Sequence, residues 1–302
     1  MSTRVLYPAA TKPHTSERSA PLQLSLLERW HLLSLDAPCV ASVWTWFLAR
    51  STSTNLSAPT LAAMFLAVWI LYAGDRLLDA RAVYRGADSA LEARHYFHAR
   101  HRSAFLVAIA LAIPALVISL AAMPGPLLRA YILLAALLAT WLGIIHTNRT
   151  PSRLPKEFAV GLFFALAVGL PSAFAGAAPG VFACLTLGCA LMSAANCLFL
   201  LAWENRPGRS SHHPAAAMAV RYLVPITAAA MFLCLAISCV LVRERHSLAS
   251  ALPTLASTLS LALLLTLHRT RQRFARTTLR ALADMALLTP LLLAPVLFIL
   301  NR

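Results

Sequence analysis

The residues best suited to chemistry are two aspartates at the end of a long apolar run, Asp75 and Asp79 in "LYAGDRLLDARAVYRG". Their i, i+4 spacing places both carboxylates on one face of a helix, about 40° apart. Like charges so placed repel, and Mg2+ completed by phosphate oxygens and water relieves the repulsion. The pair predicts a Mg2+-bound diphosphate. The alternative is that Asp75 pairs with Arg76 or Arg81 while Asp79 is solvated.

Acidic residues are scarce, because the 302-residue chain has only eleven Asp and Glu. A charge near the centre of a membrane helix costs roughly 3 kcal/mol, so acids kept beside apolar runs are candidates for function. Six fall at one predicted end of such runs: Asp36, Asp75, Asp79, Glu157, Glu204 and Asp284. For Asp284, one turn after Arg280, a helix-end ion pair is the favoured interpretation.

A basic loop follows in "HTNRTPSRLPKEFAVG", which brings Arg149, Arg153 and Lys156 to the rim of the same face. Three cations near two carboxylates can hold a diphosphate directly. The alternative is the ordinary positive charge of a cytoplasmic loop. We therefore treat these three residues as candidate substrate-binding groups.

A second polar site lies in "SAANCLFLLAWENRPGR", where Asn196 and Glu204 are eight residues apart. They lie about 80° apart on a helix, so both can border one cavity. Asn196 is well inside an apolar run and needs a hydrogen-bond partner. Tyr72 can face the same cavity, where its ring would favour a carbocation, although interfacial anchoring is its more ordinary role.

The elements that carry these residues are apolar helices. The chain is 59% hydrophobic and 12% charged, with a mean hydropathy of +0.70. We predict an all-α, nine-helix transmembrane bundle over residues 21–302, after a disordered cytoplasmic tail at 1–20. Residues 21–35 read as an amphipathic segment on the membrane surface. The predicted spans are 36–50, 57–79, 103–123, 126–146, 157–178, 180–203, 219–242, 247–267 and 281–300.

The basic residues orient this bundle. With a cytoplasmic N-terminus, all but five of the 26 Lys and Arg residues lie on the cytoplasmic side. The exceptions are Arg50, Arg129, Arg243, Arg245 and Arg302. Basic cytoplasmic loops account for the net charge of +15, so the charge does not call for nucleic-acid binding. We expect an integral protein of a bacterial inner (cytoplasmic) membrane.

Three histidines recur at three-residue spacing in "EARHYFHARHR": His95, His98 and His101. Such a triplet can bind a metal or respond to pH. The favoured interpretation is a cytoplasmic helix whose His and Arg side chains face anionic lipid headgroups.

The predicted helix count, the topology and the two polar sites together resemble the UbiA superfamily of intramembrane prenyltransferases. The resemblance implies nine helices around a cavity open to lipid. It also implies an isoprenoid diphosphate bound through Mg2+ on two acidic motifs. The implied activity is transfer of the prenyl group to an aromatic or other lipid acceptor.

The motif match is partial. Asp75 and Asp79 match the aspartates of the family's NxxxDxxxD motif, but Leu71 stands at the asparagine position. In the second motif, only Glu204 is an acid. The resemblance makes Asp75 and Asp79 the catalytic metal ligands, with Glu204 as a third, and leaves Asp284 or Asp36 to replace a missing acid. The alternatives are a non-catalytic isoprenoid-lipid binder on the same fold and a small-molecule or lipid transporter.

Overall fold

The computed structural model describes residues 25–80, 93–147, 156–204, 213–245 and 247–301. The predicted tail at 1–20 lies outside these ranges. Every regular element in the described part of the chain is helical. The all-helical prediction is therefore confirmed for those residues.

The described chain begins with α1 (Leu26–Leu32), which a capping box opens. Ser25 Oγ accepts a hydrogen bond from the Glu28 amide, and the Glu28 carboxylate accepts one from the Ser25 amide. Ser34 then adopts a φ of 59°, and α2 (Asp36–Ser51) leaves at 90° to α1. The described part of the predicted surface segment at 21–35 thus contains a short helix that lies at 90° to α2.

Among the described residues, eight helical segments are long and apolar enough to cross a membrane. The last is the α13–α14 pair taken as one span. The segments are α3 (Ala58–Asp79), α6 (Arg102–Ala121), α7 (Gly125–Thr147), α8 (Lys156–Phe174), α9 (Pro179–Glu204), α11 (Leu223–Arg245), α12 (Leu248–Thr270), and α13 (Arg276–Met285) with α14 (Pro290–Leu300). The chain therefore has the build of an integral membrane protein.

The predicted ninth span, 36–50, differs from the others. It forms α2, but α2 has only 16 residues and is shorter than a membrane-crossing helix needs. A ninth crossing exists in the described chain only if α1 and α2 together form one bent span. The break follows from Ser34, whose left-handed backbone cannot continue a helix.

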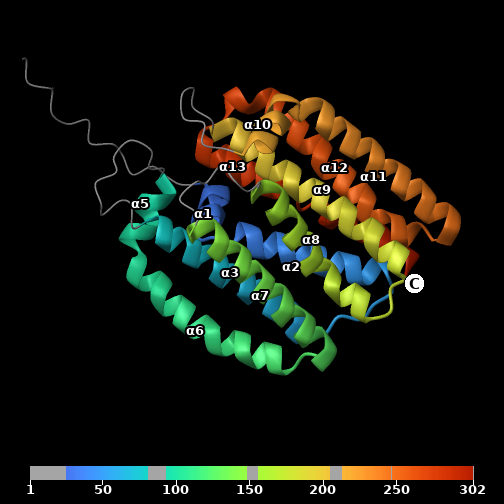
Figure 1. Ribbon diagram of the computed structural model, residues 1–302, viewed down its shortest axis with the longest axis horizontal. Helices are drawn as coiled ribbons and strands as arrows, with labels where there is room; N and C mark the ends of the chain where they lie inside the picture. Colours follow the sequence, from blue (N-terminus) through green and yellow to red (C-terminus); the bar gives the residue numbers. More distant parts are fainter. Residues whose placement is uncertain (1–24, 81–92, 148–155, 205–212, 246, 302) are drawn as a thin grey trace, which may run out of the picture.

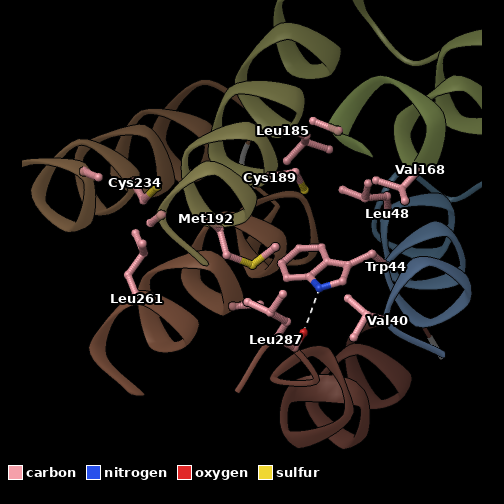
Figure 2. Close-up of a cluster of buried hydrophobic side chains, with 14 of the residues drawn as sticks. Val40, Trp44, Leu48, Val168, Leu185, Cys189, Met192, Cys234, Leu261 and Leu287 are labelled. Carbon is pink, nitrogen blue, oxygen red and sulfur yellow. Dashed lines mark hydrogen bonds between the residues drawn. The ribbon is translucent and has the colours of Figure 1, made fainter. Parts of the chain in front are cut away.

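The core of the bundle lies on α9 and α12. In the most apolar 18-residue stretch of each helix, 61% of α9 and 67% of α12 is buried inside the protein. For α6 and α7 the share is 6%. Figure 2 shows Trp44 of α2 reaching into this core, where its indole donates a hydrogen bond to the Leu287 carbonyl at 2.8 Å. A Cβ at Gly161 of α8 would lie 2.8 Å from the Ala194 nitrogen of α9. Close helix contact of this kind is typical of membrane bundles.

Three shorter elements complete the described chain: α5 (Ala93–Arg100), α10 (Pro214–Arg221) and the 3-10 turn η2 (Arg271–Arg273). Figure 1 shows α1, α5 and α13 together at one end of the bundle, on the left, and the C-terminus at the other end. We call the first the α1 end. The polar residues of interest lie at this end.

Candidate functional site

The predicted aspartates lie in the last turn of α3, and both are exposed. Helix geometry places Tyr72, Asp75 and Asp79 within about 60° of one another, on one face. Gly74, with its neighbours Leu77 and Leu78, lies on a different face and lines a small pocket against α6. The helical spacing of the two carboxylates is thus as predicted, and the pair faces away from α6.

Arg76 lies between the two aspartates and turns into the protein, where it is only 4% exposed. Its Nη1 donates to the His31 carbonyl at 2.6 Å and its Nη2 to Asp36 Oδ2 at 3.2 Å. The guanidinium carbon lies 4.4 Å from the centre of the Tyr72 ring. A buried guanidinium needs such partners. Arg76 therefore anchors the end of α3 to α1 and α2.

Asp36 is fully buried in the first turn of α2, where the partial positive charge of the helix N-terminus favours a carboxylate. Its Oδ1 accepts a hydrogen bond from the Ala37 amide at 3.0 Å. Its Oδ2 lies 2.5 Å from His31 Nδ1. The other ring nitrogen of His31, Nε2, is buried and has no hydrogen-bond partner in the described part of the chain.

Asp284 of α13 completes this group. Its Oδ2 lies 3.9 Å from His31 Nδ1, and its Oδ1 accepts a hydrogen bond from Asn196 Nδ2 at 3.3 Å. The expectation that Asn196 needs a partner inside the bundle is confirmed. The expected ion pair between Asp284 and Arg280 is wrong. Arg280 binds Glu204 of α9 instead, because α13 places its side chain against the end of that helix.

These contacts define what we call the buried polar cluster: His31, Asp36, Arg76, Asn196 and Asp284. It joins five helices whose residues are far apart in sequence, α1, α2, α3, α9 and α13. One donor atom from each of three members, the histidine and the two aspartates, lies within 4.8 Å of the others. An imidazole and two carboxylates can hold a divalent cation. The guanidinium and the amide complete a polar patch inside an apolar bundle.

The remaining predicted site residues that the structure describes are dispersed. Glu204, expected as a metal ligand, forms an ion pair with Arg280 and is 36% exposed. Lys156 begins α8 and is exposed. Arg149 and Arg153 lie outside the described residues. Tyr72 is half-buried, and the Arg76 guanidinium covers one face of its ring. The predicted contact with an isoprenoid would have to use the opposite face.

The structure also brings in residues that sequence reasoning had not placed in the site. His31 carried no signal beyond its position five residues before Asp36, because a bend between two helices separates them. Arg76 was considered only as a partner of Asp75. The sequence did hold one signal. At 100° per residue, Arg76 lies between the helix face of the two aspartates and the face of the small residues Ala73 and Ala80.

The histidine-rich segment differs from its prediction. His98 of α5 is fully buried instead of facing lipid headgroups. Its Nε2 lies 3.2 Å from Ser34 Oγ, and its ring centre lies 4.5 Å from that of Phe105. The reason is tertiary: α5 folds back onto the bend between α1 and α2. His98 thereby supports the bend beside the buried polar cluster.

Comparisons with protein-family models, with curated proteins and with solved structures found no match. The resemblance to the UbiA superfamily therefore stays a prediction from the quoted residues.

Proposed function

We propose that the protein is a membrane prenyltransferase-like enzyme that transfers an isoprenoid group from its diphosphate to a membrane-soluble acceptor. The observation that supports this most is the convergence of polar residues from five helices at the α1 end of an otherwise apolar bundle. An isoprenoid diphosphate has the same division, with an apolar chain and a charged head. Its chain would lie along the helices and its head at the α1 end.

The end of α3 suits a metal-bound diphosphate. Asp75 and Asp79 offer two exposed carboxylates on one helix face, and oxygen donors of this kind suit Mg2+. Bound there, Mg2+ would neutralise charge on the departing diphosphate. The Arg76 anchor would keep this face fixed while ligands exchange.

Besides the metal-binding carboxylates, the proposed reaction requires groups that bind the diphosphate and an apolar surrounding for the allylic carbon. The bond between the allylic carbon and the diphosphate oxygen breaks, a bond from that carbon to the acceptor forms, and the acceptor loses a proton. Lys156 is exposed at the start of α8, and with Arg149 and Arg153 of the preceding loop it would bind diphosphate oxygens. The apolar helices would keep water from the allylic carbon.

The test is release of diphosphate by the purified full-length protein in detergent. Isoprenoid diphosphates of several chain lengths are supplied with Mg2+ and with a membrane-lipid extract as the source of acceptor. We expect Mg2+-dependent release in the wild type and its loss in Asp75→Asn/Asp79→Asn. Glu244→Gln is the matched control, because Glu244 is an exposed acid at the end of α11.

The other outcomes decide between the rival functions. Binding of the isoprenoid diphosphate without release would replace the enzyme with a non-catalytic lipid binder. If liposomes that contain the protein take up the isoprenoid diphosphate only under an ion gradient, and no diphosphate is released, the protein is a transporter. Release that persists unchanged in the double variant would remove Asp75 and Asp79 from the chemistry.

A further inference from the structure

The buried polar cluster has unbalanced charge. Within the described residues it contains two carboxylates, Asp36 and Asp284, and one guanidinium, Arg76. Asp36 is 0% exposed and Asp284 13%, so water screens neither acid well. Buried like charges are costly unless something positive lies between them. Arg76 compensates one acid, and the other calls for a proton or a bound cation.

The donor atoms are already close to metal-binding geometry. His31 Nδ1 lies 2.5 Å from Asp36 Oδ2 and 3.9 Å from Asp284 Oδ2. Metal–ligand bonds of roughly 2.0–2.2 Å place neighbouring ligand atoms about 3 Å apart or slightly more. A cation with its ligand atoms about 3.2 Å apart would therefore need the first pair to open by about 0.7 Å and the second to close by about as much. Both shifts are within reach of side-chain rotation.

A separate observation points to a ligand at the same place. Asn196 is 7% exposed and donates its amide nitrogen to Asp284, but its Oδ1 is buried without a hydrogen-bond partner in the described chain. Leaving a buried acceptor unpaired costs about 1–3 kcal/mol. An amide oxygen is also an acceptable ligand for a hard or borderline cation. Asn196 thus presents an unused ligand oxygen on the same amide group whose nitrogen contacts Asp284.

We propose that His31, Asp36 and Asp284 form an interior site for a divalent first-row transition metal ion, with Asn196 beside it. An imidazole nitrogen in the donor set favours ions such as Mn2+, Fe2+ or Zn2+ over Mg2+ and Ca2+, which take oxygen ligands. The site is distinct from the Asp75–Asp79 face of α3. It does not depend on the proposed prenyl transfer.

The experiment titrates full-length protein in detergent with Mn2+ and follows free Mn2+ by electron paramagnetic resonance. Asp75→Asn/Asp79→Asn removes the proposed Mg2+ site, so any Mn2+ held there is lost. We expect one saturable equivalent to remain in that variant. We also expect at least a tenfold weaker affinity when either His31→Gln or Asp284→Asn is added. Glu244→Gln is the control for removing an acid.

A spectroscopic readout separates ligation from a merely structural role. Bound Mn2+ should show nitrogen modulation in pulsed spectra of the Asp75→Asn/Asp79→Asn variant, because an imidazole is in the donor set. Adding His31→Gln should abolish it. Adding His213→Gln, which alters an α10 capping residue, should not. If His31→Gln does not fold, Asp284→Asn tests the same affinity without removing the imidazole.

Three results would overturn the proposal. The first is that Asp75→Asn/Asp79→Asn binds no saturable Mn2+. The second is that its bound Mn2+ shows no nitrogen modulation. The third is that neither His31→Gln nor Asp284→Asn changes its affinity for Mn2+. Any of these would leave the two acids sharing a proton in a plain hydrogen-bonded network. Failure of diphosphate release with retained Mn2+ binding would end the proposed function and leave this site standing.

Discussion

Two pairs of aspartates lie at the α1 end, and they differ in solvent exposure and in how far apart their members are in the sequence. Asp75 and Asp79 are neighbours on one exposed turn of α3. Asp36 and Asp284 come from opposite ends of the sequence and meet in the interior beside His31 and Arg76. Sequence spacing reveals the first pair, whereas tertiary packing alone creates the second. The exposed pair is accessible to solvent, while the buried pair also holds helices together.

The largest expected difference comes from neutralising one acid of each pair. Asp36→Asn removes the carboxylate that accepts a hydrogen bond from the buried Arg76 guanidinium, which should destabilise the protein by about 3 kcal/mol, because an unsatisfied charged donor in the interior is the costliest kind. Asp75→Asn, the same change on the exposed face, should cost no more than about 1 kcal/mol, as for other exposed acids. Unfolding of both variants in detergent, followed by circular dichroism, measures the contrast. Equal, small effects would show that Arg76 does not anchor α3 through Asp36.

A smaller effect is expected from the amide that joins α9 to α13. Asn196→Ala removes the donor to Asp284 and should cost about 1–3 kcal/mol, since the carboxylate oxygen loses its partner in the interior. Asn301→Ala is the control, because Asn301 is exposed at the other end and donates to the Arg50 carbonyl. Its loss should cost no more than about 0.5 kcal/mol. The contrast between interior and surface would be lost if the two changes cost the same.

The ion pair between Glu204 and Arg280 should contribute less again. It is partly exposed, so Glu204→Gln should cost about 1 kcal/mol or less, and the loss should shrink with added salt. A double-mutant cycle with Arg280→Gln gives the coupling energy directly. A salt-independent coupling well above this value would mean that the pair belongs with the buried polar cluster.

The smallest effect on stability is expected where the effect on activity is largest. Asp75→Asn/Asp79→Asn removes repulsion between like charges together with the exposed contacts of these acids, so the two effects offset and the net change in stability should stay within about 0.5 kcal/mol. Mg2+ should raise the melting temperature of the wild type in detergent and leave that of the double variant unaltered. A Mg2+ response retained by the double variant would place the bound Mg2+ elsewhere.

Hydropathy predicted most of the fold, because a run of about twenty apolar residues has few alternatives to a membrane helix. At 36–50 hydropathy does not fix the count: Ser34 breaks the helix before this run and leaves α2 with 16 residues, so a ninth crossing requires α1 and α2 to form one bent span. The number of crossings in this region depends on a backbone bend. Composition does not report such a bend.

The site was harder to predict for a related reason. The i, i+4 spacing of Asp75 and Asp79 shows that they share a face, but not which way that face turns. Arg76 settles that direction by reaching His31 and Asp36, residues forty or more positions earlier. His98 shows the same limit, since its contact with Ser34 depends on how α5 folds back. Pairings across the sequence are properties of the packed bundle.

The most direct test of the central claim is Mg2+-dependent diphosphate release by Asp75→Asn/Asp79→Asn, measured beside wild type and Glu244→Gln. The account predicts release in the wild type and the control and none above background in the double variant, with all three equally folded. Release by the double variant at the wild-type rate would contradict it.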